Sequence, residues 1–166
     1  MQTFEKTNEQ IKSQIMNWFL KYMRISDFNG NEEFTIFDKI PLEEQEIINP
    51  FLDSDELPVL VLKKINEVLI VCTTKRFINI ENNTIQVLKY SDFKEHLGYK
   101  YILVDGEMKK NKEVKTNGYI AEFGLVKTNE DIIYWKIPTG NSGFSFWNIT
   151  KKFDIIGRKY RIKQID

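Results

Sequence analysis

The side chains best suited to chemistry in this chain are its single cysteine, Cys72, and its single histidine, His96. A thiol beside an imidazole would form a nucleophile pair, which requires an exposed thiol in an electropositive setting. Cys72 instead stands between Val71 and Thr73 in an apolar run, where a cysteine usually serves as a small buried hydrophobic residue. Metal sites of this type use three or four His and Cys ligands. We therefore expect no catalytic residue, no metal site and no cofactor.

The segment from Gly140 to Gly143, Gly-Asn-Ser-Gly, invites two further chemical interpretations. A nucleophile elbow, Gly-x-Ser-x-Gly, would need a glycine at the position that Phe144 occupies. A phosphate-binding loop would need a following Gly-Lys-Ser or Gly-Lys-Thr, which is not present. A turn between a strand and a helix accounts for this composition without any chemistry.

Carboxylates are concentrated in one stretch, because the chain between Pro41 and Leu62 has six acids and no Lys or Arg. The six acids are Glu43, Glu44, Glu46, Asp53, Asp55 and Glu56. Acid–base or metal chemistry would need flanking pocket residues, whereas glutamates at the start of a helix are usually solvated. We interpret these six residues as an acidic, partner-binding surface.

Basic residues are concentrated at the other end of the chain, where the stretch from Lys151 to Lys163 has six bases and one acid, Asp154. Phe153 and Tyr160 lie among these bases, a pattern that nucleic-acid or lipid binding would use. The whole chain has 24 basic and 24 acidic residues, so we expect no nucleic-acid partner. Two alternatives stay open: the basic stretch neutralises the acidic one, or the acidic one meets a cationic partner.

The bulk composition predicts one ordinary globular unit. The chain has 166 residues, of which 42% are hydrophobic and 13% aromatic, so it has enough apolar surface for a core. The lone cysteine suits a reducing compartment, and the first residues lack the apolar core of a signal peptide. No apolar run reaches the ~18 residues of a membrane span. We expect a cytoplasmic protein.

The first 52 residues predict a helical N-terminal extension packed on the core. Apolar side chains recur at helical spacing from Ile11 to Tyr22, and Thr7 with Gln10 forms a plausible capping box. This helix should end by Ser26, before the turn sequence 27–31. Pro41 should open a second helix, and Asn49-Pro50 should stop it.

Residues 53–166 predict a β-barrel-like domain with a C-terminal helix. Short β-branched runs span 57–63, 67–73, 76–80, 84–88, 100–104, 117–127 and 131–137. We expect a helical turn within 90–97 and a charged loop over 105–116. The spacing from Phe146 to Ile156 predicts a closing helix that ends at Gly157, and periodicity leaves residues 158–165 open between strand and helix.

This layout resembles a bacterial pleckstrin-homology-like domain, and the likeness in motif covers residues 57–97. Residues 57–61 read Leu-Pro-Val-Leu-Val, and residues 68–80 read Val-Leu-Ile-Val-Cys-Thr-Thr-Lys-Arg-Phe-Ile-Asn-Ile. Both segments are similar to the second and third strands of such domains, and Tyr90 to Phe93 occupies the place of the aromatic segment after the fourth strand. The resemblance implies an α+β fold: an antiparallel β-meander or partly closed barrel of about seven strands, with an N-terminal amphipathic helix and a C-terminal closing helix.

The resemblance implies a binding or scaffolding module and not an enzyme. It does not extend to phosphoinositide recognition, since Lys63 and Lys64 alone form a thin phosphate cradle. The leading hypothesis is a protein-binding module whose acidic surface engages a basic partner, such as an immunity-type protein that neutralises a basic toxin. The alternative is a peripheral membrane or lipid-binding module that uses the basic, aromatic C-terminal segment.

Overall fold

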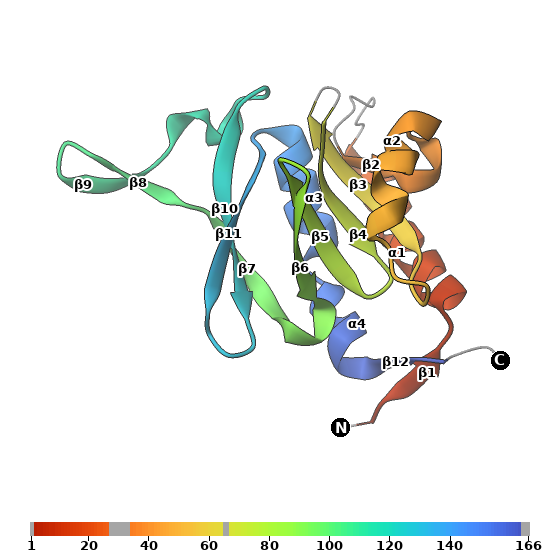
Figure 1. The fold of residues 1–166 in the computed structure, drawn as a ribbon. Helices are drawn as coiled ribbons and strands as arrows, with labels where there is room; N and C mark the ends of the chain where they lie inside the picture. The colour runs from red at the N-terminus through yellow and green to blue at the C-terminus, as the bar shows by residue number, and fades with distance from the viewer. Residues whose placement is uncertain (1, 27–33, 65–66, 164–166) are drawn as a thin grey trace.

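The computed structural model describes residues 2–26, 34–64 and 67–163 as a mixed α+β protein with three antiparallel sheets and one parallel pair of strands (Figure 1). The turn predicted at 27–31 lies outside the described residues. The described strands form four separate sheets. Two of these sheets carry the core, and the other two are two-stranded.

The larger sheet has the strand order β2-β3-β4-β5-β6. Its strands are β2 (Phe34–Ile36), β3 (Pro58–Lys64), β4 (Glu67–Thr73), β5 (Arg76–Glu81) and β6 (Thr84–Lys89). The predicted meander of short strands is confirmed here, with antiparallel neighbours throughout. One face joins the main core, and the other is covered by α2 (Leu42–Ile48) and the short 3₁₀ turns η1 (Phe37–Lys39) and η2 (Asn49–Phe51).

The smaller core sheet has the order β11-β10-β7, formed by β7 (Phe93–Tyr99), β10 (Ile120–Lys127) and β11 (Ile132–Pro138). The helical turn predicted within 90–97 is present but short: η3 (Tyr90–Asp92) is a 3₁₀ turn, and the rest of the range belongs to β7. From Phe93 onward the chain pairs with β10, and Phe93 is fully buried against Phe77.

The expected partly closed barrel is not formed, since none of the described sheets closes on itself. The chain turns at η3, where the buried Tyr90 hydroxyl donates to the Thr73 carbonyl at 2.7 Å, and β6 and β7 enter different sheets. Phe146 of α3 (Asn141–Thr150) packs between these sheets. Its ring centroid lies 5.7 Å from that of Phe34 in the larger sheet and 5.9 Å from that of Phe123 in the smaller core sheet. A helix side chain therefore fills the space between the two sheets, which hydrogen-bonded strands would join in a closed barrel.

The N-terminal helix, α1 (Asn8–Ser26), has the predicted capping box. The backbone N–H of Gln10 donates to the Thr7 hydroxyl at 3.2 Å, and the Thr7 N–H donates to the Gln10 side chain at 2.9 Å. Ile11 and Ile15 are fully buried in the same core cluster as β2 and β3. The first 52 residues thus supply an edge strand and core side chains to the larger sheet as well as helices.

The C-terminal region differs from the single helix that was predicted. It contains α3 and α4 (Phe153–Lys159), separated at Lys151 and Lys152, and α4 continues through Gly157. A Cβ at position 157 would come within 2.1 Å of the Tyr90 backbone, so this glycine permits close packing of α4 on η3. The segment left open between strand and helix includes β12 (Tyr160–Ile162), which pairs in parallel with β1 (Phe4–Lys6).

The predicted charged loop at 105–116 is also wrong. Its first part completes a hairpin of β8 (Tyr101–Val104) and β9 (Glu107–Lys110), followed by η4 (Lys112–Lys115). Asp105 and Gly106 form the connecting turn with positive φ angles of 51° and 79°, which is the geometry of the tight hairpin turns. This β8–β9 arm projects from the rest of the molecule (Figure 1).

Candidate functional site

Glu56, one of the six predicted partner-binding acids, is held inside the protein by Arg76. The Arg76 guanidinium donates to both Glu56 carboxylate oxygens from Nε at 3.0 and 3.1 Å and to Oε1 from Nη2 at 2.7 Å. Glu56 also accepts from the Thr73 hydroxyl at 2.7 Å and from the Asp53 backbone N–H at 2.8 Å. The Glu56 side chain is fully buried, and both of its carboxylate oxygens accept hydrogen bonds.

The surrounding charges keep Arg76 ionised in this position. Burial alone would lower the pKa of Arg76, but the hydrogen bond to Glu56 and the carboxylates of Asp53 and Asp55 raise it above its ordinary value. Nη2 of Arg76 also donates to the Phe51 carbonyl at 2.9 Å. The Glu56–Arg76 ion pair thus links the loop before β3 to the start of β5 and stabilises the fold at this point.

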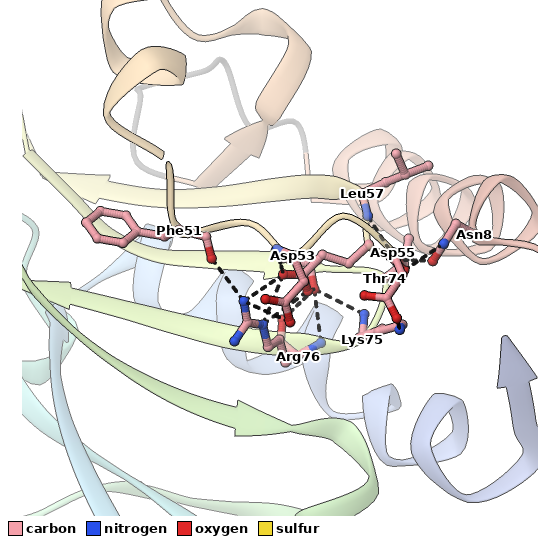
Figure 2. A network of polar contacts seen from close by, with 10 residues as sticks. Asn8, Phe51, Asp53, Asp55, Leu57, Thr74, Lys75 and Arg76 are labelled. Carbon is pink, nitrogen blue, oxygen red and sulfur yellow. Dashed lines mark hydrogen bonds and ion pairs between the residues drawn. The ribbon is translucent and has the colours of Figure 1, made fainter. Parts of the chain in front are cut away.

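Asp55 belongs to the same polar network. Its carboxylate accepts a short hydrogen bond from Lys75, which lowers the pKa of Asp55 despite the opposing effect of desolvation. The Asp55 backbone carbonyl accepts from the Asn8 side-chain amide nitrogen at 2.8 Å, and the Asn8 side-chain oxygen Oδ1 accepts from the Thr74 hydroxyl at 2.6 Å. This acidic loop is therefore joined to the β4–β5 turn and to the first residue of α1 (Figure 2).

The remaining acids divide into paired and exposed residues. Glu44 is half-buried and accepts from Lys63 at 2.9 Å, whereas Glu43 and Glu46 are exposed on α2. Asp53 has a side chain 62% exposed and a long contact of 3.4 Å with Arg76. The structure therefore brings Asp53, Asp55 and Glu56 together around Arg76. It leaves Glu43, Glu46 and Asp53 accessible to a partner.

Among the described residues, the basic C-terminal stretch forms no ion pair with the acidic one. Arg158 pairs with Asp154 within α4 at 2.7 Å. The two stretches do share a groove of about 330 Å³, lined by Asp53 and Asp55 on one side and by Tyr160 and Ile162 on the other. Three of the six acids are matched by neighbouring bases instead: Glu44 by Lys63, Asp55 by Lys75 and Glu56 by Arg76.

A second groove, of about 260 Å³, lies between α1 and the end of α3. Trp18, Lys21 and Tyr22 of α1 line it together with Lys151 and Lys152, which connect α3 to α4. This is where the structure places the first two residues of the predicted basic segment. Sequence reasoning identified those lysines but not the groove, because Lys21 is far from them along the chain.

Cys72 and His96 are both in apolar surroundings. Cys72 is fully buried, and burial raises the pKa of its thiol well above the ordinary value. His96 lies among the rings of Phe93, Phe123 and Phe146, and its Nε2 is 2.7 Å from the Thr150 hydroxyl. Burial lowers the pKa of His96 to about 3. This setting disfavours both the thiolate and the imidazolium that a Cys–His nucleophile pair requires.

The segment from Gly140 to Gly143 begins α3. Gly140 is the N-cap residue with φ 76°, and Ser142 is buried. A Cβ at Gly143 would overlap the Tyr99 hydroxyl and the Pro138 carbonyl, so the glycine permits α3 to approach the end of β11. Within the described residues, no group of three or more His, Cys, Asp or Glu side chains is arranged to hold a metal ion.

The β8–β9 arm exposes a set of large apolar side chains that sequence reasoning missed. Leu103 is 69% exposed and Met108 64%, and the two lie opposite each other in the hairpin. Tyr101, Ile102 and Val104 are also exposed. The signal for the arm was present in the sequence as Asp105-Gly106 after an apolar run, which is a strong hairpin indicator.

The apolar exposure continues from the arm onto the outer face of the smaller core sheet. Leu97 and Tyr134 are exposed on either side of Gly124, where an added Cβ would lie 3.0 Å from each. The Lys100 ammonium lies 4.7 Å from the centre of the Tyr134 ring and 3.3 Å from the Glu122 carboxylate. We call this combined area, the arm with Leu97 and Tyr134, the apolar flank.

These features define a mixed α+β protein with mainly antiparallel sheets and an uncovered apolar flank. Comparison with protein-family models, with curated proteins and with solved structures finds no match to this chain. Among the helices in the described ranges, none combines the length and hydrophobicity needed to cross a membrane.

Proposed function

We propose that this protein is a non-catalytic binding module that captures another protein through its apolar flank. The observation that carries the proposal is the β8–β9 arm, whose apolar side chains on both faces of the hairpin are exposed. Contiguous exposed apolar patches on folded proteins usually mark interaction sites. Burial of a side chain the size of Leu103 contributes about 1.5–3 kcal/mol, so covering the arm would strongly favour association.

The geometry of the arm also favours a protein as its partner. A two-stranded hairpin is at best marginally stable alone in water, and both of its outer edges present unpaired backbone groups. A partner that adds a strand or receives the arm in a groove would satisfy both the backbone and the side chains. Residues 100–115 carry five lysines against three acids, so the expected partner surface is an apolar groove with carboxylates at its rim.

The pleckstrin-homology-like relationship is part of this proposal. It is supported by the chain order, in which the meander β3 to β6 is followed by β7, β10 and β11 and then by α3. Phe146 of α3 packs against rings from both core sheets, as expected of a closing helix. A fold of this kind serves as a scaffold for binding sites and does not by itself fix the partner.

The immunity-type role, neutralisation of a basic partner, is the second candidate. It is supported by the exposure of Glu43, Glu46 and Asp53 on one segment of the chain. Glu44, Asp55 and Glu56 support it less, because Lys63, Lys75 and Arg76 already match their charges. The two candidates assign the partner to different surfaces, so one experiment separates them.

The experiment introduces a photo-cross-linking residue at Leu103 in one variant and at Glu43 in another, in cells that produce the protein. We expect one defined protein to be cross-linked through position 103 and not through position 43. Glu130, exposed in the β10–β11 turn, provides a control position. Binding of the identified protein should then be weakened by Leu103→Ser combined with Met108→Ser.

The matched variant for the second candidate is Glu43→Lys combined with Glu46→Lys, which should leave that binding unchanged. Sedimentation velocity of the purified protein distinguishes a foreign partner from a second copy of the chain. Two outcomes would contradict binding through the apolar flank and favour the immunity-type role. One is cross-linking of a partner only through position 43, and the other is loss of partner binding only in the variant with Glu43→Lys and Glu46→Lys.

A further inference from the structure

The groove between α1 and α3 combines unneutralised positive charge with an aromatic surface. Lys21, Lys151 and Lys152 line it, and among the residues that the structure describes no acid pairs with any of the three. Trp18 and Tyr22 supply aromatic surface in the same groove. Elsewhere in the protein several lysines are paired, as Lys63 is with Glu44. The positive charge of this groove is therefore available to a ligand.

The helix end nearby accounts for only part of this positive charge. Lys151 is the C-cap residue of α3, where a cation interacts favourably with the helix dipole. The dipole is equivalent to roughly half a negative charge at that end, however, and three lysines exceed it. Lys21 comes from α1, so its position beside Lys151 and Lys152 depends on the packing of the two helices and not on a local charge preference.

We infer that this groove is a binding site for an organic phosphate that carries an aromatic ring. The lysine ammonium groups would donate charge-assisted hydrogen bonds to the phosphate oxygens. The ring would lie against Trp18, since flat aromatic groups stack on indole. The groove volume of about 260 Å³ suits one small molecule of this class.

The surroundings of Trp18 support this assignment. Its ring packs on Phe153 of α4 with centroids 5.9 Å apart, so the indole is held in place before any ligand arrives. The side chain is only partly buried, which leaves indole surface in the groove. Asn148 adds a polar group at the same place: its amide nitrogen donates one hydrogen to the Phe144 carbonyl at 2.9 Å and has a second hydrogen to offer.

The test is isothermal titration calorimetry of the full chain with adenosine 5′-monophosphate as the probe. Adenosine supplies the ring without the phosphate, and ribose 5-phosphate supplies the phosphate without the base. We expect the complete probe to bind more tightly than either part, and its affinity to fall as salt rises. Quenching of tryptophan fluorescence that disappears in Trp18→Phe would locate the ring, because Trp135 is buried and Trp147 does not line the groove.

The key variant is Lys151→Gln combined with Lys152→Gln, which removes two phosphate donors. Binding of the probe should weaken about tenfold or more, because hydrogen bonds to charged groups are stronger than neutral ones. The matched control is Lys112→Gln combined with Lys115→Gln, which removes the same charge from η4, outside the groove. The control should bind as the unmodified protein does, and thermal melting should show that both variants are folded.

Two results would overturn the inference: adenosine that binds as well as the phosphorylated probe, or a Lys151 and Lys152 variant that binds the probe normally. A third comparison uses vesicles with and without anionic phospholipid. Binding to anionic vesicles without binding to the soluble probe would assign the lysines to a membrane surface and reject the small-molecule site. The site does not depend on the apolar flank, so its failure would leave the proposed protein-binding role intact.

Discussion

At the scale of single residues, the hydrogen bond of His96 places a hydrogen on its Nε2. The Thr150 hydroxyl donates to the Phe146 carbonyl at 2.7 Å, so its oxygen can only accept from His96. His96 is therefore the tautomer with hydrogen on Nε2, and its Nδ1 is a buried acceptor without a partner in the described structure. A proton added at Nδ1 would place a charge among aromatic rings. The neutral imidazole is thus part of the folded core.

This environment predicts that the fold loses stability in mild acid. The pKa of His96 is about 3 in the folded chain against about 6.5 when unfolded, so between these values the unfolded state binds more protons. Stability should therefore rise with pH in this window, by up to roughly 1.4 kcal/mol per pH unit, and level off above about pH 6.5. Urea unfolding at a series of pH values measures this slope.

The comparison variant for this measurement is His96→Leu. It removes the titrating group, so its free energy of unfolding should depend less on pH across the same window, whatever its absolute stability. An equally steep dependence in His96→Leu would show that carboxylates, and not His96, determine the acid response.

At the scale of elements, the Glu56–Arg76 pair holds the loop between η2 and β3 against the turn between β4 and β5. Removal of one member of a buried ion pair leaves the other charge without a partner. We therefore expect Arg76→Met to cost on the order of 3–5 kcal/mol, and Arg76→Met combined with Glu56→Leu to restore part of the loss. Chemical denaturation of the single and double variants measures the difference.

An exposed ion pair serves as the control for this prediction. Lys94 lies 2.7 Å from Glu130 at the surface, and Lys94→Met should leave the denaturation midpoint almost unchanged. An Arg76→Met protein as stable as Lys94→Met would mean that the Glu56 network contributes little to the fold.

Local sequence patterns predicted many of these elements. The β-branched and aliphatic run in residues 67–73 gave the bounds of β4, and Thr7 with Gln10 gave the start of α1, because both signals are short-range. The pairing of β1 with β12 was not predictable, since strands of three residues carry no periodicity and their partners are far apart in sequence. Gly157 was misread as a helix end because its role, contact with η3, is tertiary.

The candidate sites likewise have a part that the sequence predicted and a part that depends on the fold. The sequence identified the acids of 41–62 and the bases of 151–163, since composition is visible directly. It did not distinguish the buried Glu56 from the exposed Glu43, because that difference depends on Arg76 twenty residues further along the chain. The apolar flank was missed because residues 100–104 were interpreted as an ordinary strand, and their lack of a covering layer is a property of the whole fold.

At the scale of the whole molecule, the two ends of the described chain meet in a parallel ladder. Phe4 pairs with Tyr160, and Lys6 pairs with Ile162. The Lys6 ammonium lies 4.0 Å from the centre of the Tyr160 ring and 2.6 Å from the Gln14 side chain, which in turn donates to the Tyr160 hydroxyl at 3.1 Å. The ladder is therefore tied by side chains as well as by its backbone.

This arrangement has a mechanical consequence. The chain enters β1 at Phe4 and leaves β12 beyond Ile162, which lie at opposite ends of the parallel ladder. Tension applied across the two ends therefore slides the strands past each other and loads their hydrogen bonds together. In the β8–β9 hairpin, by contrast, tension across Tyr101 and Lys110 opens the bonds one after another. In single-molecule pulling, the ladder should rupture at a higher force than the arm, and Gln14→Ala should lower that force. Rupture of the β1–β12 ladder and of the β8–β9 hairpin at the same force would mean that the ladder does not resist tension across the two ends of the chain.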